Sequence, residues 1–252
     1  MRNCIDRQKG GVLDMLTVAC VWVEANVPFT PDYVWRLRAM VRKHLSVPHR
    51  FVCLTDRPSL LLEQNCDVIE IPKPQNGNAG WWSKIELFSP HHWLYGPVLY
   101  FDLDVLIVNS LELIAGLKTD LALIPHAGAF EGRGGKRVVK RYNSSVMRFE
   151  AGKHPELYTE FNASVTRRLW GDQDWIGERL PNQLTMPLAW FPRISEIHNP
   201  PKWPLGTKVV LMKRPKNHIA AMQWPWFDEV WGAGGKHERS QDNVDRWLSG
   251  HA

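Results

Sequence analysis

Two aspartates one residue apart, Asp102 and Asp104, follow a run of apolar, strand-forming residues from Val98 to Phe101. Residues two apart in an extended chain point to the same side, so we expect both carboxylates to face one way and Leu103 the other. Two like charges in an apolar setting are costly unless a cation lies between them. Divalent cations prefer carboxylate oxygens and complete their coordination with phosphate or water. The pattern therefore predicts a metal site for a phosphate-bearing ligand. The simpler alternative is that one aspartate caps a turn and the other is solvated.

Two further groups of polar residues lie at the starts of predicted elements. The stretch from Trp81 to Phe88 is predicted to begin a helix, on which Lys84 is either solvated or reaches toward a phosphate or a sugar. Asp172 and Gln173 follow Gly171 at the start of another predicted helix, where aspartate is a favoured N-cap. Each group therefore has a structural role as the alternative to a functional one.

The segment from Gly128 to Lys140 is rich in glycine and in basic residues, with Glu131 as its only acid. This composition predicts a mobile loop. The loop is either a solvated surface segment or a basic lid over a diphosphate.

The elements that must position these groups alternate between strands and helices. Apolar runs predict strands over 16–23, 50–55, 67–71, 98–101, 120–125, 142–149 and 208–212, and helices are predicted over 31–45, 113–117 and 154–169. Thr30 is the expected N-cap of the first helix. This rhythm is typical of an α/β fold with a mostly parallel central sheet flanked by helices, in which ligands bind at the carboxyl ends of the strands. The strand ends near Glu24, Asp56 and Asp102 are therefore expected to share one crevice.

Composition narrows the class of protein. The chain of 252 residues has 44% apolar and 23% charged residues, which indicates a soluble globular protein, most simply one domain with residues 1–14 and 233–252 peripheral. A net charge of +5 suits anionic ligands or surfaces. No run approaches the ~20 apolar residues of a membrane span, and the first 14 residues contain no signal-peptide core. We therefore expect a cytoplasmic protein.

Cysteine and tryptophan usage adds two observations. The four cysteines have no metal-binding spacing, so we expect reduced and mostly buried thiols. The 13 tryptophans include the clusters Trp81-Trp82 and Trp224-Pro225-Trp226. These clusters either belong to the core or line a sugar or base pocket.

Four of these stretches occur together in the order and spacing of a known family: Trp-Trp-Ser-Lys-Ile-Glu-Leu-Phe (81–88), Tyr-Phe-Asp-Leu-Asp (100–104), Tyr-Asn-Ser-Ser-Val-Met (142–147) and Asp-Gln-Asp-Trp (172–175). They resemble the GT-A nucleotide-sugar transferases, and in particular the glycogenin and bacterial lipopolysaccharide galactosyltransferase group. The resemblance implies a single Rossmann-like GT-A domain in a bacterial or phage-infected host cytosol. It also implies a hexosyltransferase that moves a sugar from a nucleotide diphosphate donor, such as a UDP-sugar, to a hydroxyl acceptor with retention of configuration.

The resemblance also implies roles for particular residues. Mn²⁺ or Mg²⁺ is expected between Asp102, Asp104 and the diphosphate, and Asp172 and Gln173 are expected beside the anomeric carbon as catalytic residues. The predicted donor-binding residues are Val21, Trp22, Thr55, Asp56, Trp82, Lys84, Asp102, Leu103, Asn143, Ser144, Ser145 and Lys213.

One stretch departs from the family pattern. The family usually supplies a third metal ligand from a histidine after the last strand, but here the stretch from Val209 to Lys216 contains no histidine. Lys213 stands near that place, and a charged lysine pairs with a diphosphate rather than with a metal. His218 is therefore the predicted third ligand, with His198 as the alternative. Otherwise two carboxylates, phosphate and water hold the metal.

The acceptor has several candidate classes. A cell-surface or secondary-metabolite glycan is the expectation that follows from the resemblance. A hydroxylated base in DNA, as used by some bacteriophage transferases, is the second candidate, because the chain is basic and rich in tryptophan. A nucleotide-sugar-binding protein without turnover is the third candidate, and its support is the missing histidine.

Overall fold

The computed structural model describes residues 15–25, 29–61, 66–73, 80–91, 94–131, 135, 137–197, 202–212 and 226–231. The peripheral segments 1–14 and 233–252, together with Lys213, His218 and His198, lie outside the described residues. The strands are β1 (Leu16–Trp22), β2 (His49–Thr55), β3 (Asp67–Glu70), β4 (Pro97–Phe101), β5 (Val105–Ile107), β6 (Leu121–Glu131), β7 (Arg137–Glu150), β8 (Leu184–Thr185) and β9 (Val209–Leu211). The α-helices are α2 (Pro31–His44), α3 (Glu112–Ala115), α4 (Glu156–Thr159), α5 (Ala163–Arg168), α6 (Asp172–Arg179) and α8 (Phe227–Trp231). Short 3₁₀ helices are η1 (Pro58–Leu60), η2 (Gly80–Phe88), η3 (Leu188–Trp190) and η4 (Ile194–Glu196).

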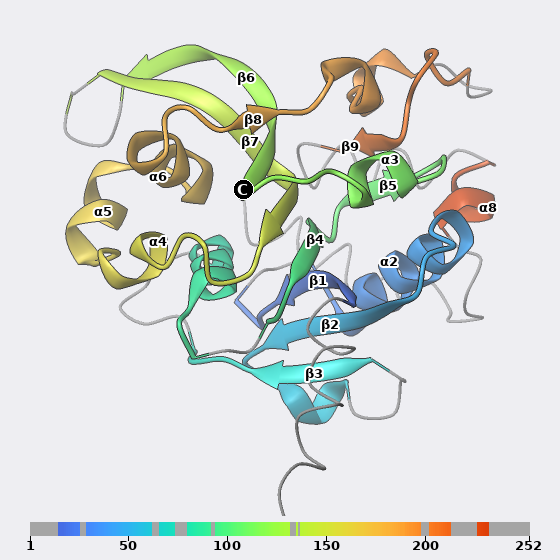
Figure 1. The fold of residues 1–252 in the computed structure, drawn as a ribbon, viewed down its shortest axis with the longest axis horizontal. Helices are drawn as coiled ribbons and strands as arrows, with labels where there is room; N and C mark the ends of the chain where they lie inside the picture. The colour runs from blue at the N-terminus through green and yellow to red at the C-terminus, as the bar shows by residue number, and fades with distance from the viewer. Residues whose placement is uncertain are drawn as a thin grey trace, which may run out of the picture.

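A seven-stranded sheet in the order β3-β2-β1-β4-β7-β6-β8 forms the centre of the molecule (Figure 1). The strands β3, β2, β1 and β4 run parallel to one another, β7 pairs antiparallel with both β4 and β6, and β8 is parallel to β6. A second sheet joins β5 to β9. The expected α/β architecture with a mostly parallel central sheet is therefore confirmed.

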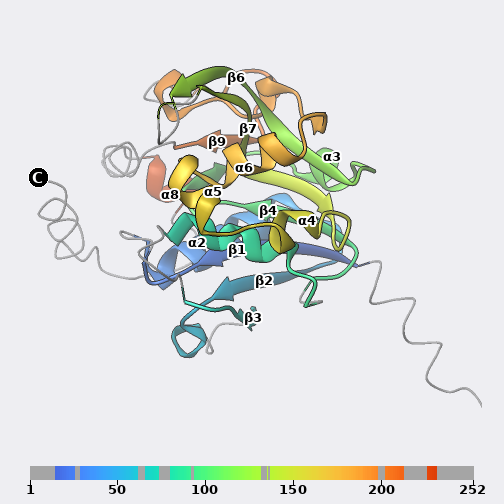
Figure 2. The same cartoon turned by 90° about the vertical axis from the view of Figure 1, so that its left-hand side faces the viewer.

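Alternating side chains of the parallel strands enter two separate cores. Val18 and Cys20 of β1 belong to one core, whereas Ala19 and Val21 belong to the other. Helix α2, helix α8 and the β5–β9 pair cover the first face, and η2 with α4, α5 and α6 covers the second (Figures 1 and 2). Strand β1 and most of β2 and β4 are buried on both faces, as their apolar sequences predict, whereas the edge strand β3 is partly exposed.

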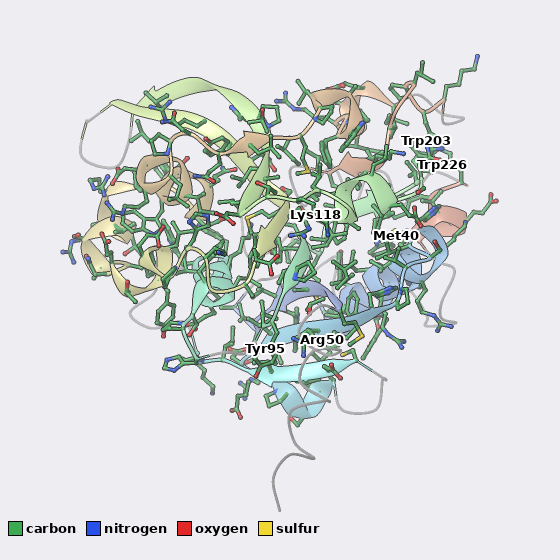
Figure 3. All side chains as sticks on the ribbon, in the orientation of Figure 1. Met40, Arg50, Tyr95, Lys118, Trp203 and Trp226 are labelled. Carbon is green, nitrogen blue, oxygen red and sulfur yellow. The ribbon has the colours of Figure 1, made fainter. Side chains whose placement is uncertain are left out.

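The aromatic cluster at α8 belongs to the first core. Trp226 lies edge-on to Trp203 with ring centroids 5.3 Å apart (Figure 3), and Trp231 lies edge-on to Tyr33 of α2 at 5.0 Å. Of the clusters considered for a pocket, Trp226 and Trp82 are thus packed in the cores, while Trp224 lies outside the described residues.

Three expectations about local structure were wrong, and a fourth was confirmed only in part. The helix predicted over 154–169 is two short helices, because the Asn162 side chain caps α5 by accepting from Ser164 N and so ends the preceding turn. The segment predicted as a loop over 128–140 is mostly a paired arm, formed by the antiparallel end of β6 and start of β7. In it Gly128 pairs with Lys140 and Glu131 with Arg137. The valines at the start of β7 favour a strand there.

The other two differences are smaller. The stretch from Gly80 to Phe88 is a 3₁₀ helix, and its apolar side chains on several sides are buried. Thr30 occupies the N-cap position of α2 but makes no side-chain capping hydrogen bond. In the described part of the chain, no helix is both long enough and apolar enough to cross a membrane.

Candidate active site

A cavity of about 710 Å³ opens at the carboxyl ends of β1 and β4. Val21 and Ala25 line it on the β1 side, Asp102 and Asp104 line its centre, and Gln173 of α6 lines the opposite side. This volume is within the usual range for sites that bind small molecules. The location is the one expected for an open α/β sheet, where ligands bind beyond the carboxyl ends of the strands.

Asp102 and Asp104 do not alternate along an extended strand. Strand β4 ends at Phe101, and Leu103 and Asp104 form a turn that leads into β5. The backbone N–H of Asp102 donates to Ser145 O of β7 at 2.8 Å, which holds the start of this turn. The prediction that the two carboxylates share a face by strand periodicity was therefore wrong. The turn nevertheless brings both aspartates, and Leu103 between them, to the same cavity.

Lys84 lies at the centre of a buried polar network on the floor of this cavity. Its Nζ lies 2.8 Å from Asp102 Oδ1 and 3.3 Å from Asp172 Oδ2, and it donates to Ser144 Oγ at 3.1 Å. Burial alone would lower the pKa of Lys84, but the carboxylates of Asp102 and Asp172 outweigh burial and raise that pKa above its ordinary value. One permanent cation therefore joins the end of β4 to the start of α6.

Two hydroxyl groups complete the network. Tyr100 Oη donates to Asp102 Oδ1 at 2.7 Å, and Ser144 Oγ donates to Asp172 Oδ2 at 2.5 Å. Burial, and then the neighbouring Asp102, raise the pKa of Tyr100 well above its ordinary value, so its hydroxyl stays protonated as a donor. Each of the two aspartates thus has one oxygen fixed by the protein's own groups.

The start of α6 is set by Gly171, which takes the N-cap position in extended conformation. Its N–H donates to Asp174 Oδ2 at 3.2 Å, so Asp174 supports the helix end. Asp172 is the first residue of the helix rather than its cap, and its carboxylate is free to face the network. Burial raises the pKa of Asp174; the charge of Lys140 opposes that rise, and the charge of Asp172 adds to it.

Asp104 makes no ion pair within the described part of the chain. Burial, followed by the charge of Asp102, raises the pKa of Asp104 to about 7. A divalent cation beside Asp104 and Asp102 would relieve this repulsion, so the donor set fits a hard metal ion. Among the described residues, however, no group of three or more His, Cys, Asp or Glu side chains is arranged to hold a metal.

The sequence and the structure were compared with those of known proteins. The sequence matches no protein-family model and no curated protein. The structure is similar to the galactosyltransferase LgtC, solved with donor and acceptor sugar analogues, with a TM-score of 0.63 and 13% identity over 90% of this chain and 99% of that chain. This chain has the GT-A fold.

Two longer proteins share the GT-A fold with it. GlyE of Streptococcus pneumoniae, a glycosyltransferase, matches with a TM-score of 0.56 and 15% identity, over 94% of this chain and 64% of that chain. The bifunctional glycosyltransferase WbbM matches with a TM-score of 0.53 and 10% identity, over 93% and 53% of the two chains. The resemblance inferred from the four sequence stretches is therefore confirmed at the level of the fold.

The GT-A fold brings most of the predicted site residues to one cavity. The predicted residues that line the cavity are Val21, Lys84, Asp102, Leu103, Asp104, Asn143, Ser144, Ser145, Asp172 and Gln173. They come from β1, η2, the β4–β5 turn, β7 and α6.

Four predicted donor-binding residues lie elsewhere and make structural contacts. Trp22 Nε1 donates to Phe29 O at 2.8 Å, and Trp82 packs in the second core. Thr55 Oγ1 accepts from the N–H of Arg57, and Asp56 Oδ1 accepts from the N–H of Glu24 at 3.0 Å. The hydrogen bond between Glu24 and Asp56 ties the ends of β1 and β2 together.

The cavity lining also includes Trp81 and Lys140, which belong to the tryptophan cluster and the basic segment considered from the sequence, and Trp170 and Arg193, which the sequence did not single out. Trp81 and Trp170 line the cavity and are 46% and 50% exposed, and the Trp81 indole Nε1 donates to the backbone Trp170 O at 3.1 Å. Lys140 and Arg193 are two further cationic residues that line it. Arg193 stands in no recognisable motif, so only its position in the fold identifies it.

Proposed function

We propose that this protein is a glycosyltransferase that moves a sugar from a nucleotide diphosphate donor, with a UDP-sugar as the first candidate, to a hydroxyl acceptor. The observation that carries the proposal is the pair of carboxylates, Asp102 and Asp172, joined by Lys84 on the floor of a cavity in a GT-A fold. The residues that line this cavity support a place for each part of the donor.

The cavity suits an extended donor. Val21, Ala25 and Phe29 line its β1 side and offer mostly apolar surface for a nucleoside. Asp102 and Asp104 lie at the centre, where the diphosphate is expected. Asn143 to Ser145 and the start of α6 follow on the far side, where small polar side chains suit a sugar.

Asp102 and Asp104 would hold Mn²⁺ or Mg²⁺ in this arrangement. One oxygen of Asp102 already accepts from Lys84 and Tyr100, which leaves its other oxygen for a metal. When bound, the ion would supply positive charge to the departing diphosphate. A third protein ligand, for which His218 was predicted, is not required if phosphate and water complete the coordination.

The proposed reaction exchanges one bond at the anomeric carbon. The bond from this carbon to the phosphate oxygen breaks, and its electron pair stays on the diphosphate while the acceptor oxygen bonds to the same face, which retains the configuration. Asp172 and Gln173 stabilise the positive charge that develops on the sugar ring. The acceptor's proton passes to the leaving phosphate oxygen, so no separate base is needed. A structure of LgtC with an active-site glutamine replaced by glutamate shows that a glutamine belongs to that protein's active site, which supports such a role for Gln173.

The acceptor class follows from the same cavity. Among the described residues that line it, the carboxylates are Asp102, Asp104, Asp172 and Asp174, and the permanent cations are Lys84, Lys140 and Arg193. This balance favours an uncharged hydroxyl acceptor such as a glycan over DNA, whose phosphates need several free cations. Transfer to a hydroxylated DNA base and binding without turnover are the outcomes that the experiment must separate.

A thermal-shift screen tests the proposal directly. The wild-type protein is mixed with UDP-, GDP- and dTDP-sugars with and without Mn²⁺, because a ligand that binds the native state raises the melting temperature. Hits are then assayed for release of the nucleoside diphosphate, alone, with mono- and disaccharides, and with hydroxymethylated DNA. We expect Asp102→Asn to lose release, and the matched control at an exposed site, Asp120→Asn, to keep it. Binding without any release would identify a binding protein, and no binding would contradict the proposal.

A further inference from the structure

Arg193 is held against the central part of the cavity by the second sheet. It forms an isolated parallel bridge with Leu211 of β9, and Leu211 pairs with Val105 of β5, the residue after Asp104. Neighbouring strands lie about 4.8 Å apart, so two such steps place the Arg193 and Val105 backbones about 10 Å apart. The Arg193 backbone therefore lies close to the residue that follows Asp104, and Arg193 lines the cavity together with Asp104.

The backbone around Arg193 is firmly anchored. Leu211 N donates to Pro192 O at 2.9 Å, and Glu196 N donates to Arg193 O at 2.8 Å. The neighbours Phe191 and Ile194 are 2% and 4% exposed. The position of Arg193 is thus fixed while its own side chain stays exposed at the cavity.

The guanidinium of Arg193 makes no hydrogen bond or ion pair within the described part of the chain. Arg57, Arg168 and Arg179 differ in this respect, because each pairs with a glutamate. Lys84, the buried cation of the cavity, is already shared by Asp102 and Asp172. An unpaired guanidinium at the edge of an acidic cavity is free to bind an anion.

We propose that Arg193 binds the diphosphate of the donor beside the β5–β9 pair. This inference rests on the proposed function. Guanidinium groups bind phosphate oxygens through two parallel hydrogen bonds, and the lining carboxylates together with a donor diphosphate carry more negative charge than Lys84 and one divalent ion neutralise. As the bond from the anomeric carbon breaks, its electron pair adds further charge to the diphosphate, and Arg193 stabilises that charge. Arg193 would thus supply positive charge to the diphosphate but not the metal ligand that the histidine supplies in the family motif.

A nucleotide series separates this role from a structural one. Calorimetric titrations in Mn²⁺ compare the diphosphate, monophosphate and free nucleoside of the base that the wild type prefers, beginning with UDP, UMP and uridine. We expect Arg193→Ala to weaken UDP binding roughly 10- to 100-fold, with uridine binding unchanged and partial recovery in Arg193→Lys. Arg167→Ala, at an exposed site on α5 outside the cavity, is the matched control and should bind UDP like the wild type.

The outcomes are distinguishable. The role of Arg193 would be overturned if Arg193→Ala lost equal affinity for UDP and for uridine, or if it bound UDP as tightly as the wild type does. Either result would leave the proposed function intact. A wild-type protein that binds no nucleoside diphosphate would overturn both. Melting temperatures of all variants show whether a loss comes from unfolding, and Arg193→Gln provides a second neutral replacement of similar length.

Discussion

Lys84 Nζ lies 3.3 Å from Asp172 Oδ2 although 87 residues separate the two in the chain, and the same nitrogen lies 2.8 Å from Asp102. This contact joins the two halves of the proposed reaction, because Asp102 lies where the diphosphate is expected and Asp172 where the sugar is expected. The lysine is 6% exposed, so its charge is offset by these carboxylates rather than by water.

Removing Lys84 should therefore cost both stability and activity. We expect Lys84→Met to lower the free energy of unfolding by about 3–5 kcal/mol, because it leaves two buried carboxylates without their cation. In the double variant Lys84→Met, Asp172→Asn the free energy of unfolding should fall by about 1–3 kcal/mol less than the sum of the falls in the two single variants. The reason is that Asp172→Asn removes one of the two carboxylates that Lys84→Met leaves without a cation. Urea denaturation of the four proteins measures this difference, and Lys153→Met at an exposed site is the control. Strict additivity would show that Lys84 and Asp172 are not coupled.

Metal binding should depend on pH near neutrality. The pKa of Asp104 is raised to about 7, so its carboxyl is mostly protonated below that pH and must lose the proton before it binds a cation. We expect the affinity for Mn²⁺ alone to fall roughly tenfold between pH 8 and pH 6. In Asp104→Asn the affinity should be lower throughout and nearly flat with pH. Titrations followed by electron paramagnetic resonance measure both proteins, and a wild-type affinity that does not change over this range would contradict the assignment.

Stability should respond to Glu86, which lies in η2 outside the cavity lining. Burial raises its folded-state pKa to about 7, above the value of an unfolded glutamate. The native state therefore binds the extra proton, and stability falls as the pH rises from about 4.5 to 7. Glu86→Gln removes this loss, so we expect it to be more stable than wild type by about 1–3 kcal/mol at pH 8 and similar to wild type near pH 4.5. Denaturation at the two pH values tests this, with the exposed Glu70→Gln as control; equal stability of Glu86→Gln and wild type at pH 8 would contradict it.

Trp81 and Trp170 should affect the acceptor more than the donor. Both residues are half-exposed and line the cavity, and Trp81 Nε1 donates to the backbone O of Trp170, two residues before α6 begins. If a saccharide acceptor stacks on them, Trp81→Ala and Trp170→Ala should each raise the acceptor KM roughly 3- to 10-fold and leave donor hydrolysis unchanged.

A matched control for the tryptophans is Tyr95→Ala. Tyr95 is 39% exposed, and Arg50 Cζ lies over its ring, 5.4 Å from the ring centroid (Figure 3). Tyr95 does not line the cavity. Its loss should leave the acceptor KM as in wild type. An unchanged acceptor KM in both tryptophan variants would show that the acceptor binds elsewhere.

The sequence alone was enough to predict where the central strands lie along the chain. Leu16–Trp22, His49–Thr55 and Pro97–Phe101 were predicted within one or two residues, because a strand buried on both faces must be apolar at every position. The four family stretches predicted the GT-A fold, which the structural comparisons confirm. They also predicted that Asp102, Ser144 and Asp172 would be near one another, as the structure places them.

Other features depended on tertiary structure. The turn at Leu103–Asp104, the paired arm from Gly128 to Lys140 and the break at Asn162 arise where local patterns are ambiguous and packing decides. The partners of Lys84 come from a strand end and a helix start far away in the chain, so no local spacing specifies them. Arg193 reaches the cavity because β9 brings its segment beside β5. Periodicity records which side of an element is buried, whereas contacts between side chains depend on how the elements pack together, and that packing is set by the whole chain.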